Sequence, residues 1–336
     1  GARALACLER FGQRLRQMHA RDVRVVGTNA LRKANRKEAF LERARAAIGH
    51  PIQVISGREE ARLIYSGVAH TMPRTEGRRL VVDIGGGSTE LIIGEGLEPL
   101  ELESTQMGCV STTGEFFADG KVSSKRLSRA RVAARQQLEP IQATYLKRGW
   151  DQAVGSSGTV RAIGEAIREL EPGYGSITPE GLELLLEALL RAGHVRNLGI
   201  AAIDEERRAV FPAGVAILAE IFEVLGLERM DVADGAMRDG LLWDMVGHFT
   251  HEDARERTVA AMQARYHVDV AQAARVEQTV LGFLAQAQDA WQLDDPATAQ
   301  LLEWSARLHE IGLDVAHSRH HLHGARLRDP ADEPVR

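Results

Sequence analysis

Two carboxylates flank a run of glycines in the segment Val81-Val-Asp-Ile-Gly-Gly-Gly-Ser-Thr-Glu-Leu91. Carboxylate oxygens suit Mg²⁺, which proteins usually hold through one or two such groups while water and phosphate complete its shell. Glycines let several backbone N–H groups turn toward one point, and a chain can cradle phosphate in this way without a lysine. The alternative is a hairpin turn in which Asp83 only caps backbone amides. The candidate phosphate-binding residues are Gly85, Gly86, Gly87, Ser88 and Thr89, and the candidate metal ligands are Asp83 and Glu90.

A second glycine turn follows a predicted strand at 152–154 and stands directly before a predicted helix. The N-terminus of a helix carries unsatisfied N–H groups and the positive end of the helix dipole, so it favours an anion. Taken alone, the turn is better explained as an ordinary one with Thr159 as N-cap. Two such turns in one α/β chain favour phosphate binding. The candidate residues of this turn are Gly155, Ser156, Ser157, Gly158 and Thr159.

Adjacent carboxylates, Glu59 and Glu60, begin the predicted helix at 58–70. Acidic side chains in a first turn often only complement the helix dipole. The functional alternative is that one of them points into a phosphate-lined cleft and acts as general base for a water. Arg32 follows a predicted strand, and its planar guanidinium suits phosphate oxygens, although a surface position explains it at least as well.

An α/β chain must position these segments. Short strands at 23–27 and 51–55 alternate with helices, which is the α/β rhythm. Strands at 79–84, 89–93 and 100–104 follow one another so closely that they predict an antiparallel meander instead of crossover units.

Helices account for most of the remaining chain. Residues 123–147 are predicted to be helical, and Thr178 followed by Pro179 predicts the start of a further helix. From about residue 249 to about residue 309, strand signals vanish and apolar residues recur at helical spacing. This change of pattern predicts a helical C-terminal domain.

The length and composition limit the class of protein. A chain of 336 residues exceeds the roughly 250–300 residues of one core, so two or three domains are expected. The net charge of −5 attracts neither nucleic acid nor an anionic membrane, so no nucleic-acid partner is expected. Cys7 and Cys109 make neither a disulfide framework nor a zinc spacing, which favours a cytoplasmic location. No apolar stretch approaches the ~20 residues that span a bilayer, so no integral membrane segment is expected.

The order of the motifs is more specific than any one of them. Together they resemble the exopolyphosphatase and guanosine pentaphosphate phosphohydrolase (Ppx/GppA) family over nearly the whole chain. The matching segments are Val26-Gly-Thr-Asn-Ala-Leu-Arg32, Ile55-Ser-Gly-Arg-Glu-Glu-Ala-Arg-Leu-Ile-Tyr65, Val82-Asp-Ile-Gly-Gly-Gly-Ser-Thr-Glu-Leu91, Met107-Gly-Cys-Val110, Gly155-Ser-Ser-Gly-Thr159, Asp234-Gly-Ala-Met-Arg-Asp-Gly-Leu-Leu242 and Leu308-His-Glu-Ile-Gly-Leu313.

The resemblance implies an actin-like, ribonuclease-H-like α/β fold of two domains with the active site in the cleft between them. An all-α, HD-like domain would follow. On this pattern, residues 1–63 are the remainder of the first actin-like domain, residues 64–250 form the second, and residues 251–336 form a truncated helical domain.

The same resemblance assigns roles to the candidate residues. Glu60 corresponds to the catalytic base of the family, and Arg32 lies in the segment that lines the cleft near the base. Asp83 and Glu90 match the Mg²⁺ and phosphate region. The two glycine turns match phosphate-binding loops in the two halves of the cleft.

One departure from the family concerns the start of the chain. Family members begin with a strand and an Asp-Leu-Gly-Ser-Asn-Ser-type loop that is absent here, and this sequence opens inside an amphipathic helix. We therefore expect an internal fragment that lacks the first phosphate loop and the C-terminal end. Such a chain would expose strand edges, so we predict that it is poorly soluble or inactive by itself.

The expected activity is that of an exopolyphosphatase, which releases terminal phosphate from inorganic polyphosphate with Mg²⁺ and a glutamate-activated water. The all-glycine run and Asp234 before Gly235 favour this branch over its sister, a guanosine pentaphosphate 5′-phosphohydrolase. A sugar or acetate kinase on the same fold is a further alternative, against which the Glu59–Glu60 pair argues. The last alternative function is a non-catalytic sensor of guanosine tetraphosphate or pentaphosphate. The resemblance also implies a homodimer.

Histidines gather near the end of the sequence, and His309-Glu310 resembles the metal-binding pair of His-Asp phosphohydrolases. Glutamate stands in place of the aspartate, so a structural relative of that domain is favoured over a working metal centre. The histidines are His309, His317, His320, His321 and His323.

Overall fold

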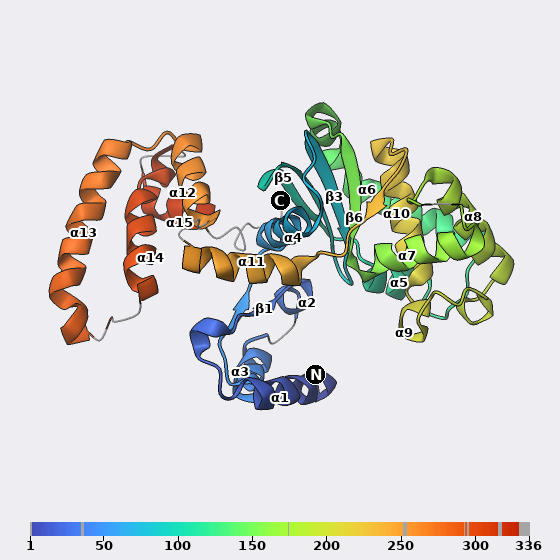
Figure 1. Cartoon of the computed structure of the whole chain (residues 1–336), viewed down its shortest axis with the longest axis horizontal. Coiled ribbons are helices and arrows are strands. Elements are labelled where there is room, and N and C mark those ends of the chain that lie inside the picture. The colour runs from blue at the N-terminus through green and yellow to red at the C-terminus, as the bar shows by residue number, and fades with distance from the viewer. Residues whose placement is uncertain are drawn as a thin grey trace. The chain divides into compact units, whose positions relative to one another are not determined.

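The structure is a computed structural model that describes residues 2–34, 37–173, 175–250, 254–291, 293, 296–314 and 318–328. It divides into two compact units, Gly1–Trp243 and Asp244–Arg336. The predicted α/β fold followed by a helical region is confirmed (Figure 1). The predicted division into three domains stays a prediction.

A five-stranded sheet in the order β5-β4-β3-β6-β7 forms the centre of the first unit. β3, β4 and β5 are antiparallel neighbours, so the predicted meander is confirmed, while β6 and β7 add parallel strands on the other side of β3. A separate parallel pair, β1 and β2, precedes this sheet in the sequence. The strands are β1 Val25–Gly27, β2 Ile52–Val54, β3 Arg78–Ile84, β4 Thr89–Glu95, β5 Glu98–Thr105, β6 Gln152–Ser156 and β7 Asp231–Val232.

Helices cover both faces of the large sheet (Figure 1). The helices of the first unit are α1 Ala2–Leu15, α2 Asn29–Arg32, α3 Lys37–Ile48, α4 Gly57–Thr71, α5 Cys109–Phe116, α6 Ser124–Arg148, α7 Ser157–Leu170, α8 Pro179–Ala192, α9 Glu205–Arg208 and α10 Phe211–Leu225, with short 3-10 turns η1 Ala20–Asp22 and η2 Val195–Asn197. α11 Met237–Thr250 begins in this unit and continues into the second.

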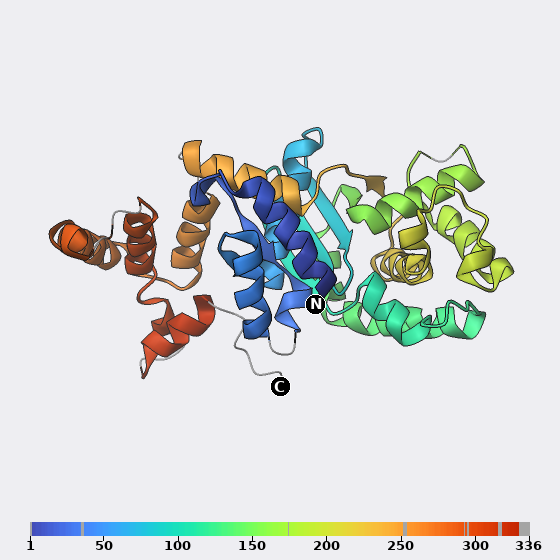
Figure 2. The ribbon, with the colours of Figure 1, turned by 90° about the horizontal axis from the view of Figure 1, so that it is seen from below.

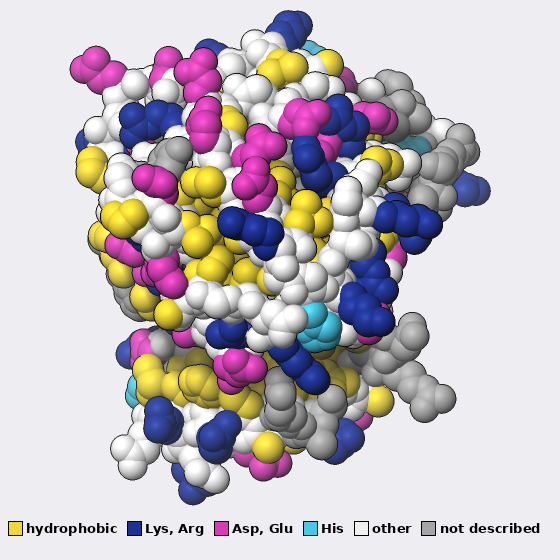
Figure 3. Space-filling view, turned by 90° about the vertical axis from the view of Figure 1, so that its right-hand side faces the viewer, with side chains coloured by type: hydrophobic (Ala, Val, Ile, Leu, Met, Phe, Trp, Pro, Cys, Tyr) yellow, Lys and Arg dark blue, Asp and Glu magenta, His cyan; other side chains and the backbone are white. Residues whose placement is uncertain are grey.

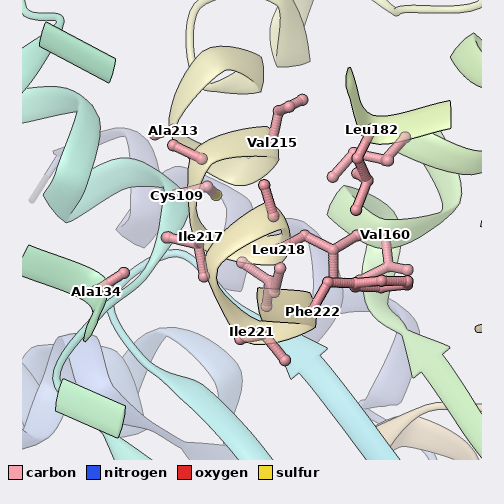
Figure 4. Packing of buried hydrophobic residues seen from close by; sticks show 14 of the residues in the cluster. Cys109, Ala134, Val160, Leu182, Ala213, Val215, Ile217, Leu218, Ile221 and Phe222 are labelled. Carbon is pink, nitrogen blue, oxygen red and sulfur yellow. The ribbon is translucent and has the colours of Figure 1, made fainter. Parts of the chain in front are cut away.

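Alternation along the strands divides the core into two layers, because successive side chains point to opposite faces of a sheet. Val81, Ile92 and Val154 pack on one face against Ile64 and Val68 of α4. The other face carries the larger core, which includes residues of α6, α7 and α10. Side chains of α10 extend into this core on all sides of the helix (Figure 4). Two packed layers therefore hold the central strands rigidly.

The segment before α4 has a small core of its own. α1 and α3 lie side by side, as Figures 1 and 2 both show, and pack with β1 and β2 around Leu5, Leu41, Ala44, Ile48 and Ile52. This core supports the β1–α2 turn, which carries Arg32.

α4 also makes close backbone contact with the start of α11. A β-carbon on Gly240 would lie 1.8 Å from the carbonyl oxygen of Leu63, and one on Gly67 would lie 2.0 Å from that of Ala236. Only residues without a β-carbon allow this approach. α4, which carries Glu60, is therefore held between the sheet and α11.

The second unit is helical throughout its described residues. A small core of Val259, Trp304, Leu308 and Ile311 joins its helices. Neither these helices nor those of the first unit, as far as they are described, have the length and apolar character that crossing a membrane requires. The elements are α12 Ala254–Arg265, α13 Val270–Trp291, α14 Pro296–Arg307, η3 Ile311–Asp314 and α15 His320–Arg328.

Candidate active site

A row of polar side chains crosses four strands at one level of the large sheet. Asp83 of β3 stands opposite Glu90 of β4, Glu90 stands opposite Ser104 of β5, and Asp83 stands beside Ser156 of β6. The Ser104 hydroxyl donates a hydrogen bond of 2.7 Å to Glu90. The two predicted metal ligands are therefore direct cross-strand neighbours.

The glycine run forms the hairpin loop that joins β3 to β4. The carbonyl of Gly85 accepts a hydrogen bond from the N–H of Cys109, and the carbonyl of Gly86 accepts from Val110 and Ser111 at the start of α5. In a trans peptide the next N–H points opposite to the carbonyl. The N–H groups of Gly86 and Gly87 therefore point away from α5 as adjacent donors, an arrangement that would suit an anion.

The hydroxyl residues after the glycines are held by the protein. Thr89 is fully buried and its hydroxyl donates to the carbonyl of Met107 at 2.7 Å. Ser88 is also buried, and its hydroxyl forms a hydrogen bond with Glu90. Phosphate binding by these two residues stays a prediction.

Glu60 occupies the first turn of α4, on the face of that helix that packs toward the sheet. The Ser56 hydroxyl caps α4 by accepting a hydrogen bond of 3.1 Å from the N–H of Glu59. Glu60 is buried, and Arg32 donates to its carboxylate at 2.9 Å and to the carbonyl of Ile55 at 2.8 Å. The structure thus brings together Arg32 and Glu60, which the sequence analysis selected separately.

Glu59, the neighbour of Glu60, faces a different set of groups. Arg62 donates two hydrogen bonds of 2.8 Å to it, and Arg24 lies 3.9 Å from it. Glu59 is half-buried in this surface network, so only Glu60 of the adjacent pair is placed toward the row on the sheet.

The three carboxylates make the site electrostatically unfavourable unless a positive charge is added. Burial raises the pKa of Asp83 to about 6, with a smaller contribution from the negative charge of Glu60. Burial and the charge of Glu60 together raise the pKa of Glu90 to about 8, although hydrogen bonds from Ser104 and Ser88 oppose this. Burial also raises the pKa of Glu60, against the charge and hydrogen bond of Arg32.

This donor set fits Mg²⁺. Asp83 and Glu90 would supply two hard oxygen ligands, and a cation in the site would offset the burial that raises the pKa of both. Among the described residues, no three His, Cys, Asp or Glu side chains are arranged to hold a metal ion together. Water and substrate phosphate would therefore complete the shell, as is usual for Mg²⁺.

The second glycine segment is more helical than the sequence pattern predicts. β6 continues to Ser156 and α7 begins at Ser157, so Ser157, Gly158 and Thr159 form the first turn of the helix instead of a loop before it. Ser157 has φ of 81°, and its hydroxyl accepts hydrogen bonds from the N–H groups of Thr159 and Val160. The N-cap position is therefore Ser156, which makes no side-chain capping bond, and the Ser157 hydroxyl caps the first turn in place of the predicted Thr159.

The side chains of this segment face several directions. Ser156 is fully buried and donates to the carbonyl of Gly235, while the Thr159 hydroxyl lies 3.6 Å from the sulfur of Cys109. A β-carbon on Gly158 would lie 2.3 Å from the guanidinium nitrogens of Arg207, and one on Gly155 would lie 2.3 Å from Val160. Phosphate binding by this segment stays a prediction, and the N-terminus of α7 is the feature that supports it.

Sequence reasoning missed Ser104, Arg207 and Asn29. Ser104 pairs with Glu90 only because a bulge at Ile93 and Gly94 shifts the β4–β5 register. The residues of the turn do not predict this bulge. Arg207 and Asn29 reach the glycine segments from distant parts of the sequence, and no spacing indicates such contacts.

Two other regions lie apart from these residues. A groove of about 790 Å³ between α1 and α3 is lined by Leu5, Arg16, Arg43 and His50, among others, and includes no candidate site residue. In the helical unit, His309 lies 3.5 Å from Glu310, and its Nδ1 donates a hydrogen bond of 2.6 Å to the carbonyl of Ala306. His317 lies outside the described residues.

A buried carboxylate beside two glycine segments on an actin-like α/β scaffold is typical of enzymes that act on phosphate groups. Residues 1–249 match the Ppx/GppA phosphatase family, and residues 254–332 match domain III of the Ppx/GppA phosphatases. The chain belongs to the Ppx/GppA phosphatase family.

Curated relatives match nearly the whole chain. A protein of Vibrio vulnificus named guanosine-5′-triphosphate,3′-diphosphate pyrophosphatase is 43% identical over 329 residues, which are 98% of this chain and 66% of the relative. A protein of the same name from Aliivibrio fischeri is 40% identical over 98% of this chain and 65% of its own length. The chain therefore spans about two thirds of the length of these relatives.

Solved structures confirm the actin-like fold class. An exopolyphosphatase of Cytophaga hutchinsonii superimposes with a TM-score of 0.65 at 24% identity, covering 74% of this chain and 82% of that one. The Ppx/GppA family member of Aquifex aeolicus gives a TM-score of 0.60 at 23% identity, over 75% and 82% of the two chains.

Proposed function

We propose that this protein hydrolyses the terminal phosphoanhydride bond of a polyphosphorylated substrate by attack of a water that Glu60 activates. The position of Glu60 carries the proposal. It is buried at the start of α4, and its charge acts on both Asp83 and Glu90 beside the glycine hairpin. A general base, two acidic ligands and a phosphate cradle are thereby in one place.

The side chains of the site divide the work of the reaction. Glu60 accepts a proton from the attacking water, and its raised pKa brings it closer to the value that suits a base at neutral pH. Arg32 holds the Glu60 carboxylate in place. The N–H groups of Gly86 and Gly87 bind oxygens of the transferred phosphate, and the shortened substrate leaves with the bridging oxygen.

Asp83 and Glu90 would hold Mg²⁺, which neutralises charge on the transferred phosphate when bound. Ser104 keeps one oxygen of Glu90 in position from the neighbouring strand. Arg207 of α9, whose guanidinium lies beside Gly158 at the start of α7, would add a positive charge for further phosphates of the substrate.

The substrate we propose is guanosine 5′-triphosphate 3′-diphosphate, because relatives that are 40–43% identical over almost the whole chain carry the name of that activity. Inorganic polyphosphate is the second candidate, and the all-glycine run at Gly85–Gly87 and Asp234 before Gly235 favour it. Both substrates end in the same terminal phosphate, so the site chemistry does not separate them.

The test is phosphate release, by the chain with an N-terminal strand and first phosphate loop added, from both substrates with Mg²⁺ at matched concentrations of terminal phosphate. We expect kcat/KM to be higher for the guanosine nucleotide. A higher kcat/KM for long-chain polyphosphate would contradict the substrate assignment and leave the reaction intact. Tight nucleotide binding with no phosphate released from either substrate would contradict the proposed reaction and favour a sensor.

A further inference from the structure

Asn29 is a buried polar residue at the glycine hairpin to which the mechanism above gives no role. It is the first residue of α2, immediately after Thr28, and only 7% of it is exposed. A β-carbon on Gly87 would lie 2.6 Å from Oδ1 of Asn29, so the carboxamide lies directly against the third glycine of the loop. Asn29 therefore adjoins the glycine whose N–H is one of the donors of the cradle.

The Asn29 carboxamide has no hydrogen-bond partner among the described residues, although its backbone carbonyl accepts from Lys33. Its nitrogen and oxygen are not among the fully enclosed polar atoms that lack a partner, so water or a ligand can reach them. The protein thus keeps an unused donor and acceptor beside the phosphate loop.

The surrounding charges determine whether a ligand would use the amide nitrogen or the amide oxygen of Asn29. Glu60, Asp83 and Glu90 already give the site three carboxylates, and one guanidinium nitrogen of Arg32 is occupied by Glu60 and the carbonyl of Ile55. A phosphate oxygen needs donors, and the amide nitrogen of Asn29 is a neutral one within reach of the Gly87 peptide. The carboxamide can rotate to present this nitrogen.

We propose that Asn29 contacts the substrate, donating a hydrogen bond from its amide nitrogen to the terminal phosphate beside the N–H groups of Gly86 and Gly87. This inference rests on the proposed function, because it assigns the terminal phosphate to the glycine hairpin. The contact involves only the terminal phosphate, so it serves the guanosine nucleotide and polyphosphate alike.

The test compares Asn29→Ala and Asn29→Asp with wild type on both substrates, with inorganic phosphate as a competitive inhibitor. Loss of one hydrogen bond to a charged group predicts a kcat/KM lower by roughly 10- to 100-fold in Asn29→Ala, by the same factor for both substrates. The inhibition constant of inorganic phosphate should rise in parallel. Asn29→Asp keeps the shape but adds a negative charge, so it should lose more activity than Asn29→Ala.

Asn197, an exposed asparagine far along the sequence, provides the matched control. Asn197→Ala should leave kcat/KM and phosphate inhibition unchanged. The variants also distinguish a substrate contact from a residue that only fills space. If Asn29 only filled space, Asn29→Ala would lower the melting temperature without changing kcat/KM or phosphate inhibition.

Three results would overturn the inference: the pattern of a space-filling residue, unchanged kinetics in Asn29→Ala, or a loss confined to the nucleotide. If wild type releases no phosphate from either substrate, the proposed function fails instead. Calorimetric titration of wild type and Asn29→Ala with inorganic phosphate and Mg²⁺ would then test the contact alone. Equal affinities in that titration would contradict it.

Discussion

Glu90 is 1% exposed and lies between Asp83 and Ser104 on the sheet, with Glu60 close enough to raise its pKa. A carboxyl group with a raised pKa stays protonated in the folded protein at a pH where the unfolded chain has already ionised it. The Glu90 carboxyl would then be ionised at neutral pH only when a cation binds beside it. Binding of the proposed Mg²⁺ and protonation of Glu90 would therefore exclude each other.

Without Mg²⁺, we predict that the free energy of unfolding falls as the pH rises from about 5 to about 8. The unfolded chain loses the Glu90 proton near the ordinary pKa of 4.5, whereas the folded protein loses it near about 8. The folded state thus binds more protons in this window, and stability decreases with pH. Asp83, with its pKa of about 6, adds to the decrease in the lower part of the window.

Urea unfolding at several pH values, with and without Mg²⁺, measures this effect. Added Mg²⁺ should stabilise the protein more at the upper end of the window, because binding needs ionised ligands. Glu90→Gln should flatten the pH profile and weaken the Mg²⁺ effect. An unchanged profile in this variant would show that Glu90 does not have the raised pKa.

Part of the site could be predicted residue by residue. Helical periodicity places Glu60 on the same face of α4 as Ile64 and Gly67, so its inward position follows from the pattern. The short hairpin loop makes Asp83 and Glu90 cross-strand partners. Contacts between distant segments, such as that of Asn29 with Gly87, depend on tertiary packing and have no local signal.

Among the elements, α4 connects most directly to the proposed chemistry. Its start carries the base, and its middle touches α11 through Gly67 and Gly240 with no space for a β-carbon. The sequence pattern predicts the elements well where local preferences determine the structure, as in the β3–β4–β5 meander. It places the start of α7 too late because the turn at Ser157 requires a positive φ that serine rarely adopts.

We predict that Gly240→Ala destabilises the first unit by about 1–3 kcal/mol, because the added methyl group must push apart two helix backbones. Gly282 in α13 is the matched control, since nothing lies within 4 Å of a β-carbon there. Gly282→Ala should stabilise its helix by roughly 0.5–1 kcal/mol, the usual difference between the two residues. Thermal unfolding followed by calorimetry compares the two. Similar stability changes in both variants would contradict the close α4–α11 contact.

At the scale of the whole molecule, the charge pattern favours a local site over a broad basic surface. The net charge is −5, and on the face in Figure 3 basic and acidic side chains are interspersed. Under the proposed function, a polyanionic substrate would therefore be attracted locally by the glycine segments, Arg32 and bound Mg²⁺. The order of the motifs predicted the fold class correctly, because these motifs mark strand ends that the fold brings together. Substrate choice depends on groups beyond the terminal phosphate and could not be predicted in this way.

The central claim is that Glu60 activates the attacking water, and the most direct test is phosphate release by Glu60→Gln beside Glu59→Gln. Both variants remove one negative charge from the first turn of α4, so they differ only in which carboxylate is lost. We predict that Glu60→Gln lowers kcat by roughly 10²- to 10⁴-fold, whereas Glu59→Gln stays within about fivefold of wild type. Equal losses in the two variants, or a Glu60→Gln enzyme that retains its kcat, would contradict the account.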